Sequence, residues 1–146
     1  MKDLERYLEE IVEPTIKDLE ANRTSVRHMF IACVVVFHSV DYLAYSRKST
    51  KPRQKFGNQS PAFKIVDNVA HAFKHVKTGN PDDPDHFLRY DEVISRPPGV
   101  AGVMQAGLSR INDPRGGVTL DKKRDIDLYD VVKTAVAFLR TKLTES

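Results

Sequence analysis

Cysteine is nearly absent from this chain of 146 residues, and tryptophan is absent altogether. The single thiol, on Cys33, cannot form an internal disulfide, and a lone cysteine excludes zinc sites that are built from several cysteines. A chain that does not depend on disulfides is typical of a reducing compartment. We therefore expect a cytoplasmic protein.

Long hydrophobic runs are also lacking. The longest covers residues 29–37, with His28 before it and His38 after it, whereas a membrane-spanning helix needs about 20 apolar residues. The chain begins with charged residues, and no apolar segment follows a basic one as it does in a secretory signal. These features predict a soluble chain that does not cross a membrane.

The remaining composition is that of an ordinary globular domain. Hydrophobic residues make up 40% of the chain and charged residues 29%, close to the average for folded soluble proteins. A chain of this length normally forms one hydrophobic core. We expect a single domain, 1–146, whose helical part covers residues 1–79 and 127–146.

Apolar residues at helical spacing predict helices over residues 1–21, 25–46 and 61–78, and a closing helix from residue 127. Pro14 lies inside the first pattern and predicts a kink there, or two short helices in near continuation, because proline removes a backbone N–H and crowds the preceding turn. The second pattern is apolar on most sides, as in a central helix.

Two further segments differ from these helices. Residues 88–126 mix β-branched residues with glycines and turn sequences, which predicts an antiparallel β-meander of two or three strands, near residues 90–95, 100–109 and 118–120. Residues 46–59 have no apolar period and predict a loop. The expected fold is mainly α (α+β): a bundle of four to five helices with a β-meander inserted before the last one.

Charge is distributed unevenly along the chain. Residues 1–21 hold three basic and seven acidic groups, whereas residues 22–60 hold seven basic groups and only one acid, Asp41. This excess predicts a candidate nucleic-acid-binding loop, in which Phe56 stacks on a base. A basic loop of this kind can equally be solvated, or neutralised by the acidic first helix. Its basic residues are Arg47, Lys48, Lys51, Arg53 and Lys55.

A second candidate site is a polar seam formed by His38, Asp41, His71, Lys74 and His75. His71 and His75 are four residues apart, so both imidazoles lie on one side of their helix. With His38 they give an alternative metal site, a pattern that resembles DinB-like metal-binding bundles. In the competing interpretation, His38 pairs with Asp41 and the other two histidines are solvated, directed away from the second helix.

The pattern of residues 1–78, with FHSVDYLAY in the second helix and AHAFKHVK in the third, resembles small bacterial HEPN-like helical-bundle proteins of unknown function. Families of this type include ribonucleases with an Arg-x(4–6)-His signature on a late helix. Here only Arg23 and His28 have that spacing, and no histidine follows His86. This departure counts against ribonuclease activity, and it leaves a non-catalytic relative and an RNase relative as alternatives.

These features favour a binding, regulatory or oligomerising module over an enzyme, and they indicate no cofactor. The expected partner is another protein or a second copy of the chain, burying part of the first helix or a β edge. The alternatives are a nucleic-acid-associated HEPN-like protein and a metal-dependent hydrolase that uses the histidines.

Overall fold

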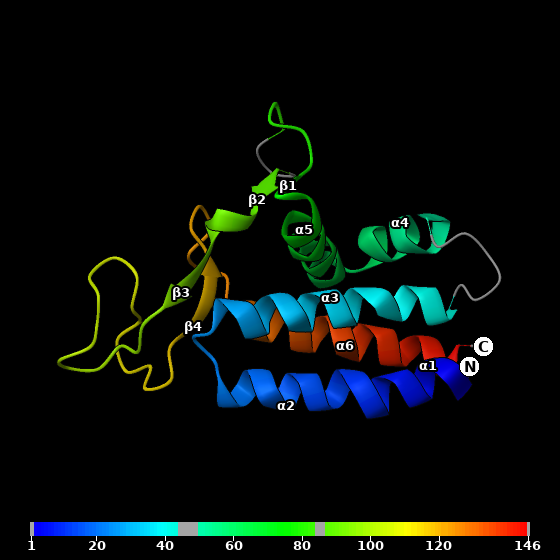
Figure 1. The fold of residues 1–146 in the computed structure, drawn as a ribbon, viewed down its shortest axis with the longest axis horizontal. Coiled ribbons are helices and arrows are strands. Elements are labelled where there is room, and N and C mark those ends of the chain that lie inside the picture. Colours follow the sequence, from blue (N-terminus) through cyan, green and yellow to red (C-terminus); the bar gives the residue numbers. More distant parts are fainter. Residues whose placement is uncertain (1, 44–49, 84–86, 146) are drawn as a thin grey trace.

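A computed structural model describes residues 2–43, 50–83 and 87–145, and it is mainly helical. Three helical rods lie side by side with their long axes aligned (Figure 1), and α5 packs against two of them, α3 and α6. Small antiparallel strand pairs precede the closing helix α6 (Leu128–Thr144). The predicted class, a helical bundle with β elements before its last helix, is confirmed.

The first rod consists of α1 (Lys2–Tyr7), the π-helical turn η1 (Leu8–Val12) and α2 (Glu13–Ala21). The Glu13 N–H bonds back to Leu8 O, a wide turn that ends directly before Pro14. Proline cannot donate to the carbonyl four residues earlier, and π turns arise where the regular helical ladder is interrupted. The helical ladder is therefore interrupted by a π turn, and two short α-helices lie on either side of it.

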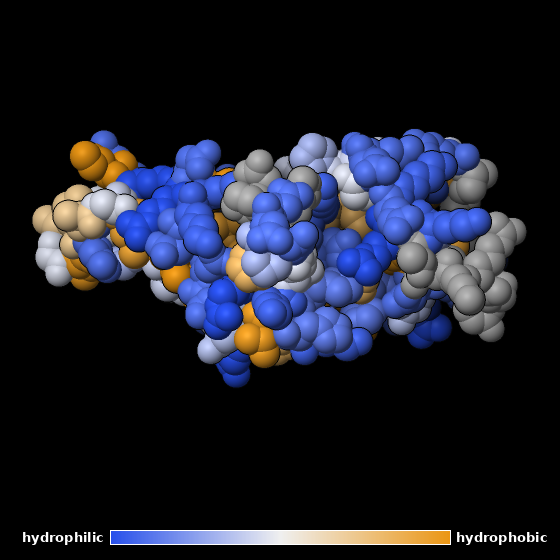
Figure 2. Space-filling view, turned by 90° about the horizontal axis from the view of Figure 1, so that it is seen from above, coloured by the Kyte–Doolittle hydropathy of each residue, from blue (hydrophilic) through white to orange (hydrophobic). Residues whose placement is uncertain are grey.

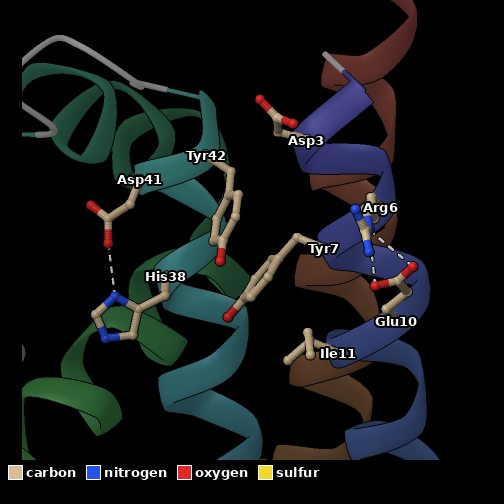
Figure 3. Close-up of a pocket in the computed structure, with 8 residues that line it drawn as sticks. All are labelled: Asp3, Arg6, Tyr7, Glu10, Ile11, His38, Asp41 and Tyr42. Atoms are coloured by element: carbon tan, nitrogen blue, oxygen red, sulfur yellow. Dashed lines mark hydrogen bonds and ion pairs between the residues drawn. The ribbon is translucent and has the colours of Figure 1, made fainter.

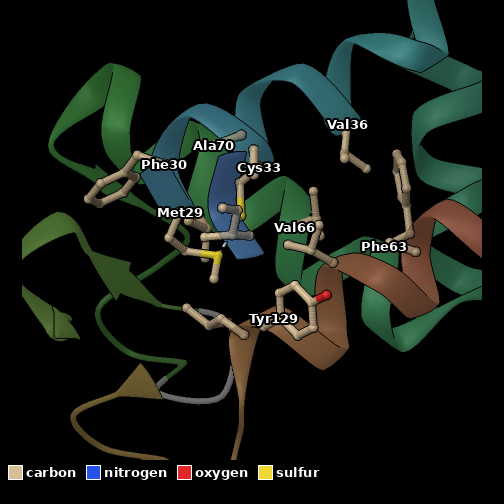
Figure 4. Packing of buried hydrophobic residues seen from close by; sticks show 14 of the residues in the cluster. Met29, Phe30, Cys33, Val36, Phe63, Val66, Ala70 and Tyr129 are labelled. Atoms are coloured by element: carbon tan, nitrogen blue, oxygen red, sulfur yellow. Dashed lines mark hydrogen bonds between the residues drawn. The ribbon is translucent and has the colours of Figure 1, made fainter. Parts of the chain in front are cut away.

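The central helix is α3 (Val26–Leu43), which contacts α1, η1, α2, α5, α6 and strand β3 (Val93–Arg96). Met29, Cys33 and Val36 are buried in the core that it shares with α5 and α6 (Figure 4). By length and composition α3 is also the one described helix that could cross a membrane. Its contacts on several sides explain its apolar character, because a core helix has the same composition.

Residues 50–59 form a helix, α4 (Thr50–Gln59), so the predicted loop is wrong over these residues. Phe56 is buried, with its ring edge-on to Phe63 and Phe138 at centroid distances of 5.8 and 5.4 Å. Pro52 lies in the first turn, where its missing N–H interrupts no helical hydrogen bond. A single buried aromatic residue, Phe56, therefore packs α4 onto the core, although the sequence of this helix shows no apolar period.

Helix α5 (Pro61–His75) begins where the sequence predicts, with the Phe63 N–H donating to Ser60 Oγ at 3.1 Å. It ends three residues before the predicted boundary, because Val76 has a φ of +70° and leaves the helical conformation. A short strand, β1 (Lys77–Thr78), follows and pairs with β2 (Leu88–Arg89).

The β part differs from the predicted meander. Strand β3 pairs with β4 (Gly117–Leu120), and η2 (Tyr90–Glu92) is a 3-10 turn. Residues 100–109 contain turns in place of the predicted strand, because Gly102 and Gly107 have φ values of +89° and +75°, which do not occur in a regular strand. Apolar side chains gather at this end of the molecule (Figure 2); the exposed ones include Val100, Val103, Met104 and Ile111.

A buried ion pair joins the strands to the bundle. The Arg96 side chain is 1% exposed, and its Nη2 lies 2.7 Å from Asp127 Oδ2 and 3.2 Å from Asp113 Oδ2. Asp127 also caps α6, because its Oδ1 accepts the Tyr129 N–H at 2.9 Å. A Cβ on Gly117 would lie 2.8 Å from Arg96 Nη2, so only glycine leaves the guanidinium its space.

Replacing Asp127 by alanine tests this pair. Asp127→Ala leaves the Arg96 charge buried without its nearest partner and removes the helix cap, so we expect a loss of about 3–5 kcal/mol in the free energy of unfolding, measured by urea denaturation. The control Asp130→Ala removes an exposed carboxylate from the same helical turn, and its effect should stay below about 1 kcal/mol. Equal effects of the two variants would contradict the structural role of the pair.

Candidate functional site

An open groove of about 870 Å³ lies between the N-terminal rod and the second half of α3 (Figure 3). Two aromatic rings from these different helices meet in it. The remaining lining residues are mostly charged. The groove is lined by Asp3, Arg6, Tyr7, Glu10, Ile11, His38, Asp41 and Tyr42.

Tyr7 and Tyr42 are stacked, with a centroid distance of 4.0 Å and an angle of 18° between the ring planes. The Tyr7 hydroxyl donates to Val35 O at 2.8 Å, which fixes this ring against α3. Burial, together with the nearby Tyr42 and Asp41, raises the pKa of Tyr7 to about 12. Tyr7 is therefore a neutral aromatic wall at physiological pH.

The rim of the groove carries more negative than positive charge. Arg6 Nε lies 3.0 Å from both carboxylate oxygens of Glu10, and His38 Nδ1 lies 2.7 Å from Asp41 Oδ2. Both pairs are about half exposed or more, so each adds little to stability. With Asp3, three carboxylates face one arginine, which makes the rim acidic.

The predicted polar seam is divided between two places. His38 and Asp41 line the groove, whereas His71 and His75 lie on α5. The ring of Phe37 contacts both His38 and His71, at centroid distances of 5.4 and 4.9 Å. Within the described residues, no group of three or more His, Cys, Asp or Glu side chains could hold a metal ion. The three-histidine metal site is therefore not formed.

His71 is part of a cluster that the sequence analysis missed. Asp67 is 9% exposed and lies between Arg53, whose Nε is 2.8 Å from Oδ2, and His71, whose Nδ1 is 2.7 Å from Oδ1. The four-residue spacing of Asp67 and His71 was available as a signal. The contribution of Arg53 was hidden, because its segment has no helical period. Lys74 and His75 are exposed farther along α5.

The candidate basic loop changes its character in the structure. Arg53 is paired with Asp67, and Phe56 is buried and has no free face for a base. Lys51 and Lys55 remain exposed on α4. Arg47 and Lys48 lie outside the described residues.

No protein-family model matches this chain, and the searches of curated proteins and of solved structures found no match either. The HEPN-like resemblance therefore stays a prediction. Of the groove residues, the sequence analysis identified His38 and Asp41. It gave neither Tyr7 nor Tyr42 a binding role, because nothing in the helical pattern shows that their rings meet.

The raised pKa of Tyr7 predicts a specific pH dependence. Its folded value of about 12 exceeds the unfolded value of about 10, so its contribution to stability is complete below pH 10 and is lost as the pH rises toward 12. The unfolding free energy of the wild type should therefore fall more steeply over this interval than that of Tyr7→Phe. Tyr90→Phe, at an exposed tyrosine outside the groove, should parallel the wild type in the same denaturation series.

Proposed function

We propose that this chain is a binding module and that the groove between the N-terminal rod and α3 receives a basic, partly apolar segment of a partner protein. The observation that carries the proposal is the stacked pair Tyr7–Tyr42 inside an acidic rim. Tyrosine is enriched at interfaces because it offers a large, rigid apolar surface with a polar tip. A volume of about 870 Å³ is sufficient for several side chains.

The charges around the groove define the chemistry of the partner. Asp3, Glu10 and Asp41 are on its rim, and Glu5 and Glu9 are exposed on the same rod. Carboxylates arranged in this way attract cationic side chains and accelerate association at low salt. Lysine and arginine also have long apolar stems that can lie on the tyrosine rings while their charges reach the rim.

Two groups with nucleophilic character are held in their neutral forms, which supports binding over catalysis. Cys33 is buried in the core, and burial raises its pKa to about 12. The Tyr7 hydroxyl is hydrogen-bonded to Val35 O and keeps its proton. A thiol reacts as the thiolate, so neither group is activated for attack on a substrate.

A short synthetic peptide of lysine and leucine, titrated into isotopically labelled protein, tests the proposal. We expect amide shift changes along α1, η1 and the second half of α3, and binding that weakens as salt is added. Tyr42→Ala should weaken binding about tenfold, or about 1.4 kcal/mol, because it removes one of the two rings. The matched control is Tyr90→Ala, since Tyr90 is exposed to a similar degree, 48% against 41%, and lies outside the groove.

The distribution of the shift changes decides the outcome. Changes that fall mainly outside the groove, or equal peptide affinities of Tyr42→Ala and the wild type, would overturn the proposal. Light scattering without peptide identifies the partner more closely. A dimer that Tyr42→Ala converts to a monomer would show that the segment comes from a second copy.

Nucleic-acid binding is a second candidate, favoured by the exposed Lys51 and Lys55 on one side of α4. Because Phe56 is buried, these residues would contact phosphates without reading sequence. Lys51→Ala/Lys55→Ala should then lower the slope of log affinity against log salt for single-stranded RNA by about 1.4. Lys2→Ala/Lys17→Ala, exposed lysines on the acidic rod, is the control. An unchanged slope in the α4 variant would exclude this helix as the binding surface.

A further inference from the structure

Asp67 fixes the protonation of the His71 ring. His71 Nδ1 lies 2.7 Å from Asp67 Oδ1 and 2.9 Å from the backbone oxygen of the same residue. The hydrogen bond from the ring goes to the backbone oxygen, whereas Oδ1 contacts the ring without a hydrogen bond, so Nδ1 carries the hydrogen. The neutral ring consequently keeps its lone pair on Nε2.

The His71 ring is partly open to solvent, since its side chain is 20% exposed. The edge contact with Phe37, together with the contacts to Asp67, holds the ring in one orientation. Arg53, on the other oxygen of Asp67, keeps that carboxylate in place.

His75 lies one helical turn farther along α5. Its ring centroid is 6.1 Å from that of His71, the planes are inclined by 30°, and the side chain is exposed. Residues four apart on a helix lie on the same side, and the exposed His75 ring can rotate toward its neighbour. Two imidazole nitrogens can therefore approach one ion at the usual distance of about 2.0–2.1 Å.

We propose that His71 and His75 form a two-histidine site for a transition-metal ion of the Zn²⁺ or Cu²⁺ type, with Asp67 as the carboxylate behind His71. Imidazole ligands suit these ions, whereas Mg²⁺ and Ca²⁺ require oxygen ligands. A metal-bound histidine typically donates its other ring N–H to a carboxylate or a carbonyl, and His71 already donates to the Asp67 carbonyl. Water or a bound molecule would complete the coordination.

The site differs from the three-histidine arrangement, because His38 is held by Asp41 on the adjacent groove. It is also independent of the proposed groove function, since neither His71 nor His75 lines the groove. Lys74 lies between the two ligands in sequence, and its charge lowers the affinity for a cation unless the flexible side chain turns away. Two nitrogen ligands without a charged ligand predict moderate binding.

Calorimetric titration of the untagged full chain with Zn²⁺, and separately with Cu²⁺, tests the site. We expect one ion per chain, a loss of affinity of at least about tenfold in His75→Ala, and no change in the control His38→Ala, which removes another exposed histidine. Asp67→Asn keeps the backbone carbonyl but removes the negative charge 2.7 Å from Nδ1, and it should weaken binding about tenfold. Circular dichroism of each variant separates this effect from unfolding.

Nitrogen-detected spectra of the imidazoles give a readout that a purely structural histidine would not show. The apo protein should have His71 protonated on Nδ1, and Zn²⁺ should shift Nε2 of His71 and of His75. Three results would overturn the proposal: no 1:1 binding, equal metal affinities of His75→Ala and His38→Ala, or an Nε2–H tautomer at His71. Equal affinities would mean an adventitious ion only.

Discussion

The rest of the structure depends on one constraint, the burial of α3 between the N-terminal rod on one side and the helices α5 and α6 on another. One side of this helix packs on the N-terminal rod and another on α5 and α6, which leaves only a narrow strip for polar residues. At its second half, the side toward the rod brings Tyr42 onto Tyr7, and the side toward α5 brings Phe37 onto His71. The groove and the histidine cluster therefore both follow from the packing of a single helix.

The contribution of each charged side chain to stability depends on how deeply it is buried. Arg96 is almost fully enclosed, and a cation in that environment requires nearby carboxylates, which Asp127 and Asp113 supply. The pairs on the groove rim are largely hydrated and contribute little to stability. They remain able to interact with an arriving ligand. The buried charges hold the β strands on the bundle, and the exposed ones give the groove its acidic character.

Where a helix starts or is interrupted depends on residues adjacent in the sequence, and these features could be predicted. Apolar spacing predicted the start of α5 at residue 61, and Pro14 marked the interruption of the first rod. Residues 50–59 were misassigned because Phe56 and Arg53 are held by residues distant in sequence, Phe138 and Asp67. The segment 100–109 was misassigned for the opposite reason: its β-branched residues suggested a strand, but glycines with positive φ determine the backbone. The groove could not be predicted, because it depends on how two helices are placed.

His38 and His71 each lie beside an aspartate carboxylate, but the surroundings of the two histidines differ. His38 and Asp41 form a pair that is about half exposed on each side, so water competes for both groups and the ring can leave its carboxylate at little cost. His71 and Asp67 are 20% and 12% exposed, with an aromatic edge on the ring and an arginine on the carboxylate. Because the side chains of His71 and Asp67 are both restricted, the His71 ring keeps one tautomer and one orientation, as a metal-binding nitrogen requires. The difference between the two histidines therefore lies in their surroundings, and it is this difference that singles out α5.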